Sequence, residues 1–484
     1  MGSFSEFSNW GFINILAILF TSLLLASILK KNIPFLKASL IPTSVLAGIM
    51  LLIISTVYRA ITGELIYNTP FFGGNGMTVF ELITYHCLAL GFIASSMKVG
   101  KEKFGKKRAR EIFDSGVTTV STYLLQAVLG LGITLLIAWL FMPSLFKASG
   151  VLLPFGFGQG TGQALNYGTI YETEHGFVGG ANFGLTVAAL GFLSASLGGV
   201  IHLNILKRKK GHRSQELRNT LSEKDRVHAE EIIMSGSMDK LAVQIGIVVF
   251  VYFCTHLVMY LLGQLLPNLS GTIYGFNFLI GVLLATALKG ILNGLMKVKV
   301  VKKQHVNNFL MDRVSNTCFD LMVTAGIAAI RLDLIAQYWH VLLILGVVGM
   351  ASTYFYNYFI AKKLFPEYSD AQFLGMYGML TGTASTGIIL LRELDGEFKT
   401  PVADNLVYQS LPAIVFGFPI MLLANLAPTA PELTLGILAA FFVVMNVILF
   451  RNQIFRKRKK GIAMSETTEE SSEAETADEP TNNA

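Results

Sequence analysis

Charged residues are scarce in this chain. Only 14% of its 484 residues are Asp, Glu, Lys or Arg, whereas 52% are hydrophobic, and the mean hydropathy is +0.56. Soluble globular domains carry about 25% charged residues, so this composition excludes an ordinary water-soluble fold. Cysteine is equally rare. The three cysteines, Cys87, Cys254 and Cys318, lie in apolar segments without CxxC or metal-ligand spacing, which excludes a disulfide scaffold and a zinc site.

Catalytic motifs are missing as well. The sequence contains no HExxH, no Ser and His pair at a recognisable spacing and no acidic dyad within one apolar segment, so we expect neither an enzyme nor a bound cofactor. The net charge of +7 does not indicate nucleic acid as a partner. The basic residues lie in short loops between apolar segments, where positive-inside bias explains them.

Long apolar runs dominate the rest of the chain. A run of about 20 mostly apolar residues is long enough to cross roughly 30 Å of hydrocarbon as a helix. Because such runs recur along nearly the whole length, the sequence predicts an all-α polytopic membrane protein. We predict eleven spans, at residues 10–29, 39–58, 77–97, 117–141, 181–206, 241–262, 274–295, 317–335, 341–360, 404–426 and 433–450.

A short glycine phrase occurs once in each half of the chain. Residues 157–164 read FGQGTGQA and residues 377–384 read YGMLTGTA, so both fit aromatic-Gly-x-x-Thr-Gly-x-Ala. An irregular backbone cannot face lipid, because each unsatisfied N–H or C=O there costs several kcal/mol. We therefore predict two re-entrant hairpins, at 150–172 and 371–391, whose tips line a polar cavity. The alternative is a pair of ordinary helices whose glycines allow close packing.

The distribution of basic residues predicts the topology. With the N-terminus outside and neither hairpin crossing, all of the 38 Lys and Arg residues except Arg59, Lys147, Lys289 and Arg331 fall in cytoplasmic segments. A crossing hairpin would abolish this bias. Five crossings in each half is an odd number, so the second half must be inverted relative to the first. The predicted parts are inverted repeats at 10–206 and 241–427, a cytoplasmic linker at 207–240, an extra helix at 433–450, and a cytoplasmic basic anchor with an acidic tail at 451–484.

The hairpin tips form the predicted binding site. The helix that follows each tip would present free N–H groups and the positive end of its dipole, which favour an anion. Hydroxyl and amide side chains add polar contacts, and two hairpins that enter from opposite faces can meet near mid-membrane. The candidate substrate-binding residues are Gly158, Gln159, Gly160, Thr161, Gly162, Gln163, Gly378, Thr381, Gly382, Thr383, Ser385 and Arg331.

Two further groups of polar residues each have two interpretations. Arg331, near the outer end of the eighth span, either pairs with a substrate carboxylate or anchors that span at the outer headgroups. Asn182, Asp404 and Asn405 open the helices that follow the hairpins. They are either N-caps or, beside unwound carbonyls, ligands of a coupling cation such as Na⁺.

The pattern resembles the bacterial sodium:glutamate symporter family. The resemblance lies in the two inverted five-helix units, in the glycine-rich loop before the last helix of each unit, and in the segment GFGQGTGQALNYGTIYE that begins at Gly156. It implies a homodimer in the bacterial cytoplasmic membrane that takes up glutamate or a related small carboxylate with Na⁺ by alternating access, with the substrate held between the hairpin tips.

The chain also departs from that family. Neither loop contains the family's Gly-Gly-x-Gly, the second has Met379 and Leu380 in its middle, and the eleventh span exceeds the usual ten. The identity of the carboxylate therefore stays open. A passive channel for a small anion is the alternative function, but it requires polar residues along several spans, whereas here they concentrate at the hairpins.

Overall fold

The computed structural model describes residues 6–98, 105–210, 239–298, 306–396, 399–451 and 453. Most of the predicted linker and of the acidic tail lies outside the described residues. Within them the chain is helical and contains no strand, which confirms the predicted all-α class. The helices are α1 (Phe7–Asn32), α2 (Pro34–Ala38), α3 (Thr43–Thr62), α4 (Gly76–Met97), α5 (Lys106–Leu140), α6 (Leu152–Gln159), α7 (Thr161–His175), α8 (Gly180–Lys210), α9 (Lys240–Leu265), α10 (Ser270–Gly275), α11 (Asn277–Lys297), α12 (Asn308–Ala328), α13 (Leu332–Ile335), α14 (Trp339–Leu364), α15 (Ser369–Leu380), α16 (Ala384–Arg392), α17 (Val402–Tyr408) and α18 (Ser410–Leu426), followed by the helix Pro431–Arg451.

The long helices agree with the predicted membrane spans. Among the described residues, nine helices are long and apolar enough to cross a membrane, and the bent pair Val402–Tyr408 and Pro412–Leu426 makes a tenth. The remaining predicted span, 317–335, corresponds to α12. The predicted end of this span is wrong. α12 stops at Ala328, and the backbone N–H of Arg331 donates to the side chain of Asn182 in α8 rather than to a carbonyl of α12.

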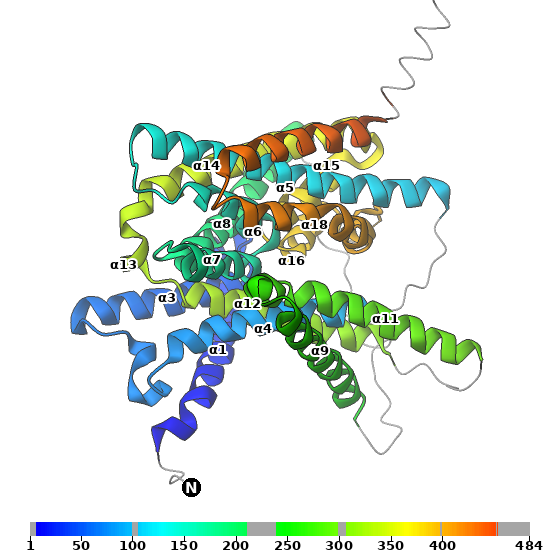
Figure 1. The fold of residues 1–484 in the computed structure, drawn as a ribbon. Helices are drawn as coiled ribbons and strands as arrows, with labels where there is room; N and C mark the ends of the chain where they lie inside the picture. Colours follow the sequence, from blue (N-terminus) through cyan, green and yellow to red (C-terminus); the bar gives the residue numbers. More distant parts are fainter. Residues whose placement is uncertain are drawn as a thin grey trace, which may run out of the picture.

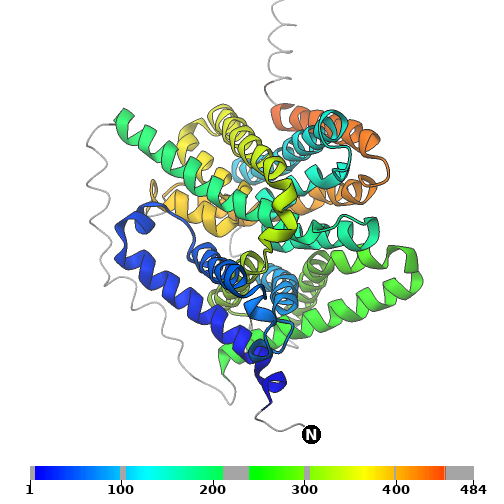
Figure 2. The same ribbon diagram turned by 90° about the vertical axis from the view of Figure 1, so that its left-hand side faces the viewer.

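The helices form two bodies, and each body mixes the two halves of the chain (Figures 1 and 2). Body 1 contains the first three long helices of each half, α1, α3 and α4 with α9, α11 and α12. Body 2 contains α5 to α8, α14 to α18 and the helix Pro431–Arg451. Helix α7 packs on α8 within body 2 and also on α4 and α12 of body 1, so it forms the main contact between the bodies.

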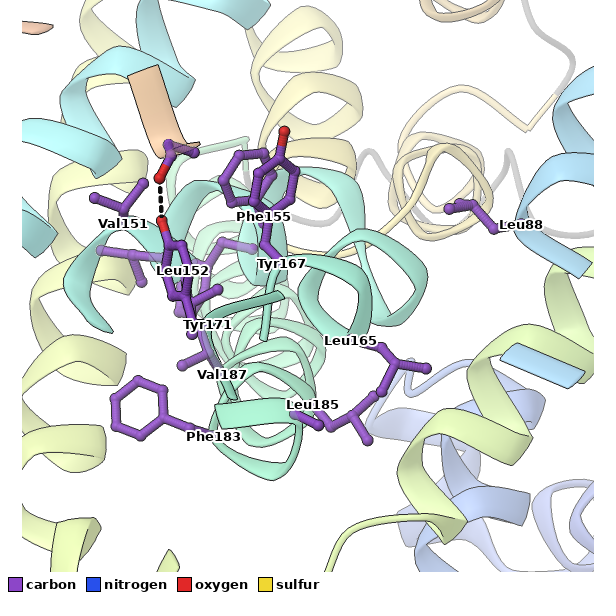
Figure 3. Packing of buried hydrophobic residues seen from close by; sticks show 14 of the residues in the cluster. Leu88, Val151, Leu152, Phe155, Leu165, Tyr167, Tyr171, Phe183, Leu185 and Val187 are labelled. Atoms are coloured by element: carbon purple, nitrogen blue, oxygen red, sulfur yellow. Dashed lines mark hydrogen bonds between the residues drawn. The ribbon is translucent and has the colours of Figure 1, made fainter. Parts of the chain in front are cut away.

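Two broken helix pairs lie in body 2, at the positions of the glycine phrases. α6 and α7 join at Gly160, and α15 and α16 join at residues 381–383. Aromatic side chains hold the first pair together: the ring of Phe155 stacks on that of Tyr167 with centroids 4.0 Å apart (Figure 3). The hydroxyls of Tyr167 and Tyr171 donate to backbone carbonyls of α18, at 3.0 and 2.7 Å. These contacts anchor the first pair to the rest of body 2.

The helix Pro431–Arg451 is attached to body 2 by polar contacts as well as by apolar packing. Near its middle, Tyr356 Oη of α14 donates to Asn446 Oδ1 at 2.8 Å. At its end, Arg451 Nη1 donates to Asp114 Oδ1 of α5 at 2.7 Å. A carboxylate buried among helices needs such a partner, because an uncompensated charge there is costly.

Replacement of Arg451 should therefore destabilise body 2. In Arg451→Gln, the 10% exposed carboxylate of Asp114 keeps only Arg110, at 3.6 Å, and we expect a loss of about 1–3 kcal/mol. Thermal unfolding of the purified protein in detergent measures this loss. Glu432→Gln removes the more exposed pair with Lys147 and is the matched control, with an expected effect within about 0.5 kcal/mol. Equal melting temperatures for the two variants would contradict the assignment.

Candidate functional site

The two glycine tips lie against each other. Gly160, between α6 and α7, has φ +80° and ψ −170°, a conformation that is essentially restricted to glycine. A Cβ on Gly160 would lie 3.6 Å from Thr383 Cγ2 and 3.8 Å from Gly382 O. Both of these residues belong to the tip between α15 and α16. Segments from the two halves of the chain thus meet inside body 2.

Four helix ends converge at this contact. α6 ends at Gln159 and α7 begins at Thr161, while α15 ends at Leu380 and α16 begins at Ala384. The first N–H groups of a helix have no acceptor within it and carry positive partial charge, whereas the last carbonyls carry negative partial charge. The site therefore offers N–H donors suited to an anion beside carbonyls suited to a cation.

Two threonines of the glycine phrases are hydrogen-bonded inside the protein. Thr161 and Thr381 are fully buried. Thr161 Oγ1 donates to Met322 O of α12 at 3.3 Å, and Thr381 Oγ1 donates to Tyr377 O at 2.6 Å. Gly378, one turn before Thr381, packs on the backbone of α16. These groups fix the shape of the tips, and their hydroxyls already have acceptors.

The accessible side of the site belongs mainly to the second tip. Ser385 is exposed, and Thr383 and Gln159 are half-buried. Thr383 also caps α16, because its Oγ1 accepts a hydrogen bond from Thr386 N at 3.4 Å. The accessible side chains are thus two hydroxyls and one amide, and the buried Gln163 Nε2 of the first tip is a further donor, without a partner among the described residues. No residue of either glycine phrase is charged.

Helix α7 attaches the first tip to body 1. A Cβ on Gly162 would lie 2.9 Å from Met322 Sδ of α12. About one turn further, Asn166 Nδ2 donates to Gln163 Oε1 at 3.3 Å and to Gly275 O at the break between α10 and α11. Helix α16 packs instead on α15, α8 and α17, all in body 2. The two broken helix pairs are therefore engaged unequally with body 1.

Helix α5 supports both tips. Tyr123 Oη donates to Gly158 O at 3.0 Å, and Gln126 Nε2, one turn later, donates to Leu380 O at 2.9 Å. Gly158 allows this approach, because a Cβ there would lie only 2.1 Å from Tyr123 Cε1. Carbonyls near the C-terminal ends of α6 and α15 thus accept hydrogen bonds from side chains of one helix, α5.

Tyr123 and Gln126 were not among the residues predicted from the sequence, although a signal for them exists. Residues 121–126 read STYLLQ and residues 352–357 read STYFYN, and they lie in α5 and α14, the corresponding helices of the two halves. We call this repeat the STY motif. A comparison of the halves outside the glycine phrases would have found it.

Arg331 does not contact the tips. Its backbone N–H donates to Asn182 Oδ1 at 2.6 Å, and its guanidinium pairs at 3.2 Å with Asp333, which also binds Arg59 of α3. A pocket beside these groups is lined by Arg59, Gly63, Glu64, Leu65, Asn68, Thr69, Pro70 and Arg331.

The three predicted cation ligands are not brought together. Asn182 lies in the first turn of α8. The residue of α8 that faces Thr381 O is Gly191, about 13 Å further along the helix. Asn405 is fully buried; its Nδ2 donates within body 2, and its Oδ1 has no partner among the described residues. Asp404 is exposed and pairs with an arginine of α5.

One comparison with known proteins gives a match. The family model described as sodium/glutamate symporter matches residues 10–399. No match is found among curated proteins. The matched region begins in α1 and includes both glycine tips. Helices α17 and α18 and the helix Pro431–Arg451 lie beyond it.

The contact between α5 and the first tip can be tested by stability measurements. Gly158→Ala places a methyl group in the ring of Tyr123, and overpacking of this kind costs about 1–3 kcal/mol. Tyr123→Leu makes room, so the double variant should be more stable than the sum of the single effects implies. Melting temperatures of the wild type, both single variants and the double variant form the cycle. Additive effects would show that the two residues do not interact.

Proposed function

This chain belongs to the sodium/glutamate symporter family, and we propose that it carries glutamate or a related small carboxylate together with Na⁺ across the bacterial cytoplasmic membrane, as a homodimer. The proposal for where the substrate binds depends on one observation, the contact of Gly160 with Thr383 and Gly382. That contact unites the tips of two broken helix pairs from inverted halves, the arrangement in which secondary transporters form their substrate sites.

The chemistry of the tips suits an amino dicarboxylate. A carboxylate can accept hydrogen bonds from the free N–H groups at the start of α7 or α16, and two such helix starts are present for two carboxylates. The carbonyls near the ends of α6 and α15 already accept one hydrogen bond each from α5, but each has a second lone pair and lies at the negative end of a helix dipole, which suits an ammonium group. Thr383, Ser385 and Gln159 provide further hydrogen bonds from partly accessible side chains.

The unequal contacts of the hairpins support alternating access. α7 packs on body 1, whereas α16 does not pack closely on it and leaves Ser385 exposed. We propose that the two broken pairs are re-entrant hairpins and that substrate exchanges here from the side of the second hairpin, the cytoplasm in the predicted topology. Movement of body 2 against body 1 would exchange the roles of the hairpins, because each body contains equivalent helices of both halves.

Uptake into proteoliposomes tests this function. With an inward Na⁺ gradient, labelled glutamate or a related dicarboxylate should accumulate above its external concentration, and replacement of Na⁺ by choline should abolish accumulation. A panel of amino acids and dicarboxylates identifies the substrate. Flux that equilibrates without accumulating and ignores the gradient would contradict coupled transport and would instead indicate a facilitator.

Substitutions at the tips separate ligand contacts from structural contacts. Thr383→Val and Ser385→Ala remove accessible hydroxyls, and each should raise KM for the carboxylate by roughly 5–20-fold, equivalent to about 1–2 kcal/mol of hydrogen bonding. Thr161→Val removes a buried hydroxyl bonded to α12 and should lower the maximal rate more than it changes KM. Thr173→Val is the control, since its hydroxyl lies at the exposed far end of α7. Unchanged kinetics in both tip variants would place the substrate elsewhere.

A further inference from the structure

Two buried amide oxygens lie where α5 packs on α14 inside body 2. Gln126 is fully buried and Asn357 is 1% exposed. Gln126 Oε1 and Asn357 Oδ1 have no hydrogen-bond partner among the described residues. A buried carbonyl oxygen without a partner costs about 1–3 kcal/mol, and native structures contain few of them. Two such oxygens on facing helices indicate a ligand.

Neighbouring backbone carbonyls fix the orientation of both amides. Gln126 Nε2 donates to Leu380 O at 2.9 Å, and Asn357 Nδ2 donates to Thr353 O at 3.0 Å. A carbonyl oxygen only accepts, so the amide nitrogens must face these groups. Rotating either amide by 180° would place two oxygens against each other. The free atoms are therefore oxygens rather than nitrogens.

Both amides belong to the STY motif, and the two copies bond each other reciprocally. Gln126 Nε2 in the first copy donates to Thr353 Oγ1 in the second at 2.9 Å. Asn357 Nδ2 in the second copy donates to Thr122 Oγ1 in the first at 3.3 Å. This exchange is the one that a pseudo-two-fold axis between inverted repeats produces. The two free oxygens therefore belong to equivalent residues of the two copies.

We propose that Gln126 Oε1 and Asn357 Oδ1, with the hydroxyl oxygens of Thr122 and Thr353, form a Na⁺ site. All four proposed ligand atoms are neutral oxygens, which suit a hard monovalent cation. The site lacks the carboxylates that Ca²⁺ sites use. The C-terminal end of α15 lies beside these side chains, because Gln126 also donates to Leu380 O, and it contributes negative partial charge. This inference rests on the proposed Na⁺ coupling and specifies where the ion acts.

The position of this site explains how ion and substrate are coupled. Gln126 supplies an oxygen to the ion, and its nitrogen holds Leu380 O, the last carbonyl before the second tip. An ion that orders Gln126 therefore also orders the tip against which the substrate binds. Coupling of this kind is reciprocal: bound substrate should raise the affinity for Na⁺ by the same factor as Na⁺ raises that for the substrate.

Thermal unfolding without substrate tests the site directly. NaCl titrated against KCl and choline chloride at constant ionic strength should raise the melting temperature of the purified full-length protein with Na⁺ only, because an ion that binds the folded state stabilises it. Gln126→Ala and Asn357→Ala should need at least about 10-fold more Na⁺ for the same shift. Tyr356→Phe, which removes a hydroxyl from the same turn of α14, should keep the wild-type midpoint.

An isosteric variant covers the case in which the alanine variants do not fold. Thr353→Val keeps the shape of the side chain and removes one proposed ligand oxygen, while Gln126 Nε2 keeps Leu380 O as its acceptor, so it should raise the Na⁺ midpoint by about 3–10-fold. No Na⁺-specific shift in the wild type, or unchanged midpoints in the substituted proteins, would overturn the site and leave ordered water as the ligand of these oxygens.

Uptake assays on the same preparations separate this inference from the proposed function. Na⁺-specific stabilisation that the alanine variants lose, without carboxylate uptake by the wild type, would support the site and contradict the substrate. Na⁺-driven uptake by the wild type, with the same Na⁺ midpoint in all variants, would support the function and overturn the site.

Discussion

A backbone that leaves a helix inside an apolar environment must find partners for its N–H and C=O groups, at a cost of several kcal/mol for each one left unpaired. This requirement organises the centre of the protein. The chain breaks at Gly160 and at residues 381–383, and both breaks lie in body 2. Tyr123 and Gln126 of α5 donate to the carbonyls that precede them. The first N–H groups of α7 and α16 begin at these breaks, so polar groups concentrate where the two tips meet.

The same requirement applies to both halves of the chain. A single broken helix pair would present one set of free helix ends, and the second half supplies a second set at α15 and α16. Packing α5 on α14 brings the two STY motifs together, and their amides and hydroxyls satisfy each other in part. Gln126 links the second tip to this contact between the motifs, since its Nε2 donates both to Leu380 O and to Thr353 Oγ1 of α14. In the proposed transport function, one side chain would thus serve both the ion and the tip that binds the substrate.

Local features of the sequence were enough to predict the helices and the positions of the broken pairs, because apolar length and a repeated glycine phrase depend on neighbouring residues only. Features that depend on distant contacts were not. Arg331 pairs with Asp333, which also binds Arg59 of α3, and no spacing in the sequence reveals this contact with α3. Just beyond the end of α12, the backbone N–H of Arg331 donates to Asn182 Oδ1 of α8. The STY motif was visible in the sequence but has meaning only once α5 and α14 are known to be adjacent.

The two ends of the described chain belong to different bodies. α1 begins body 1, whereas the helix Pro431–Arg451 is attached to α5 and α14 of body 2 through Asp114 and Tyr356. The distance between these two helices is thus a coordinate for the relative displacement of the bodies. If body 2 moves against body 1 as proposed, fluorophores placed on α1 and on the last helix would report that movement as a change in energy transfer, without a label near the tips.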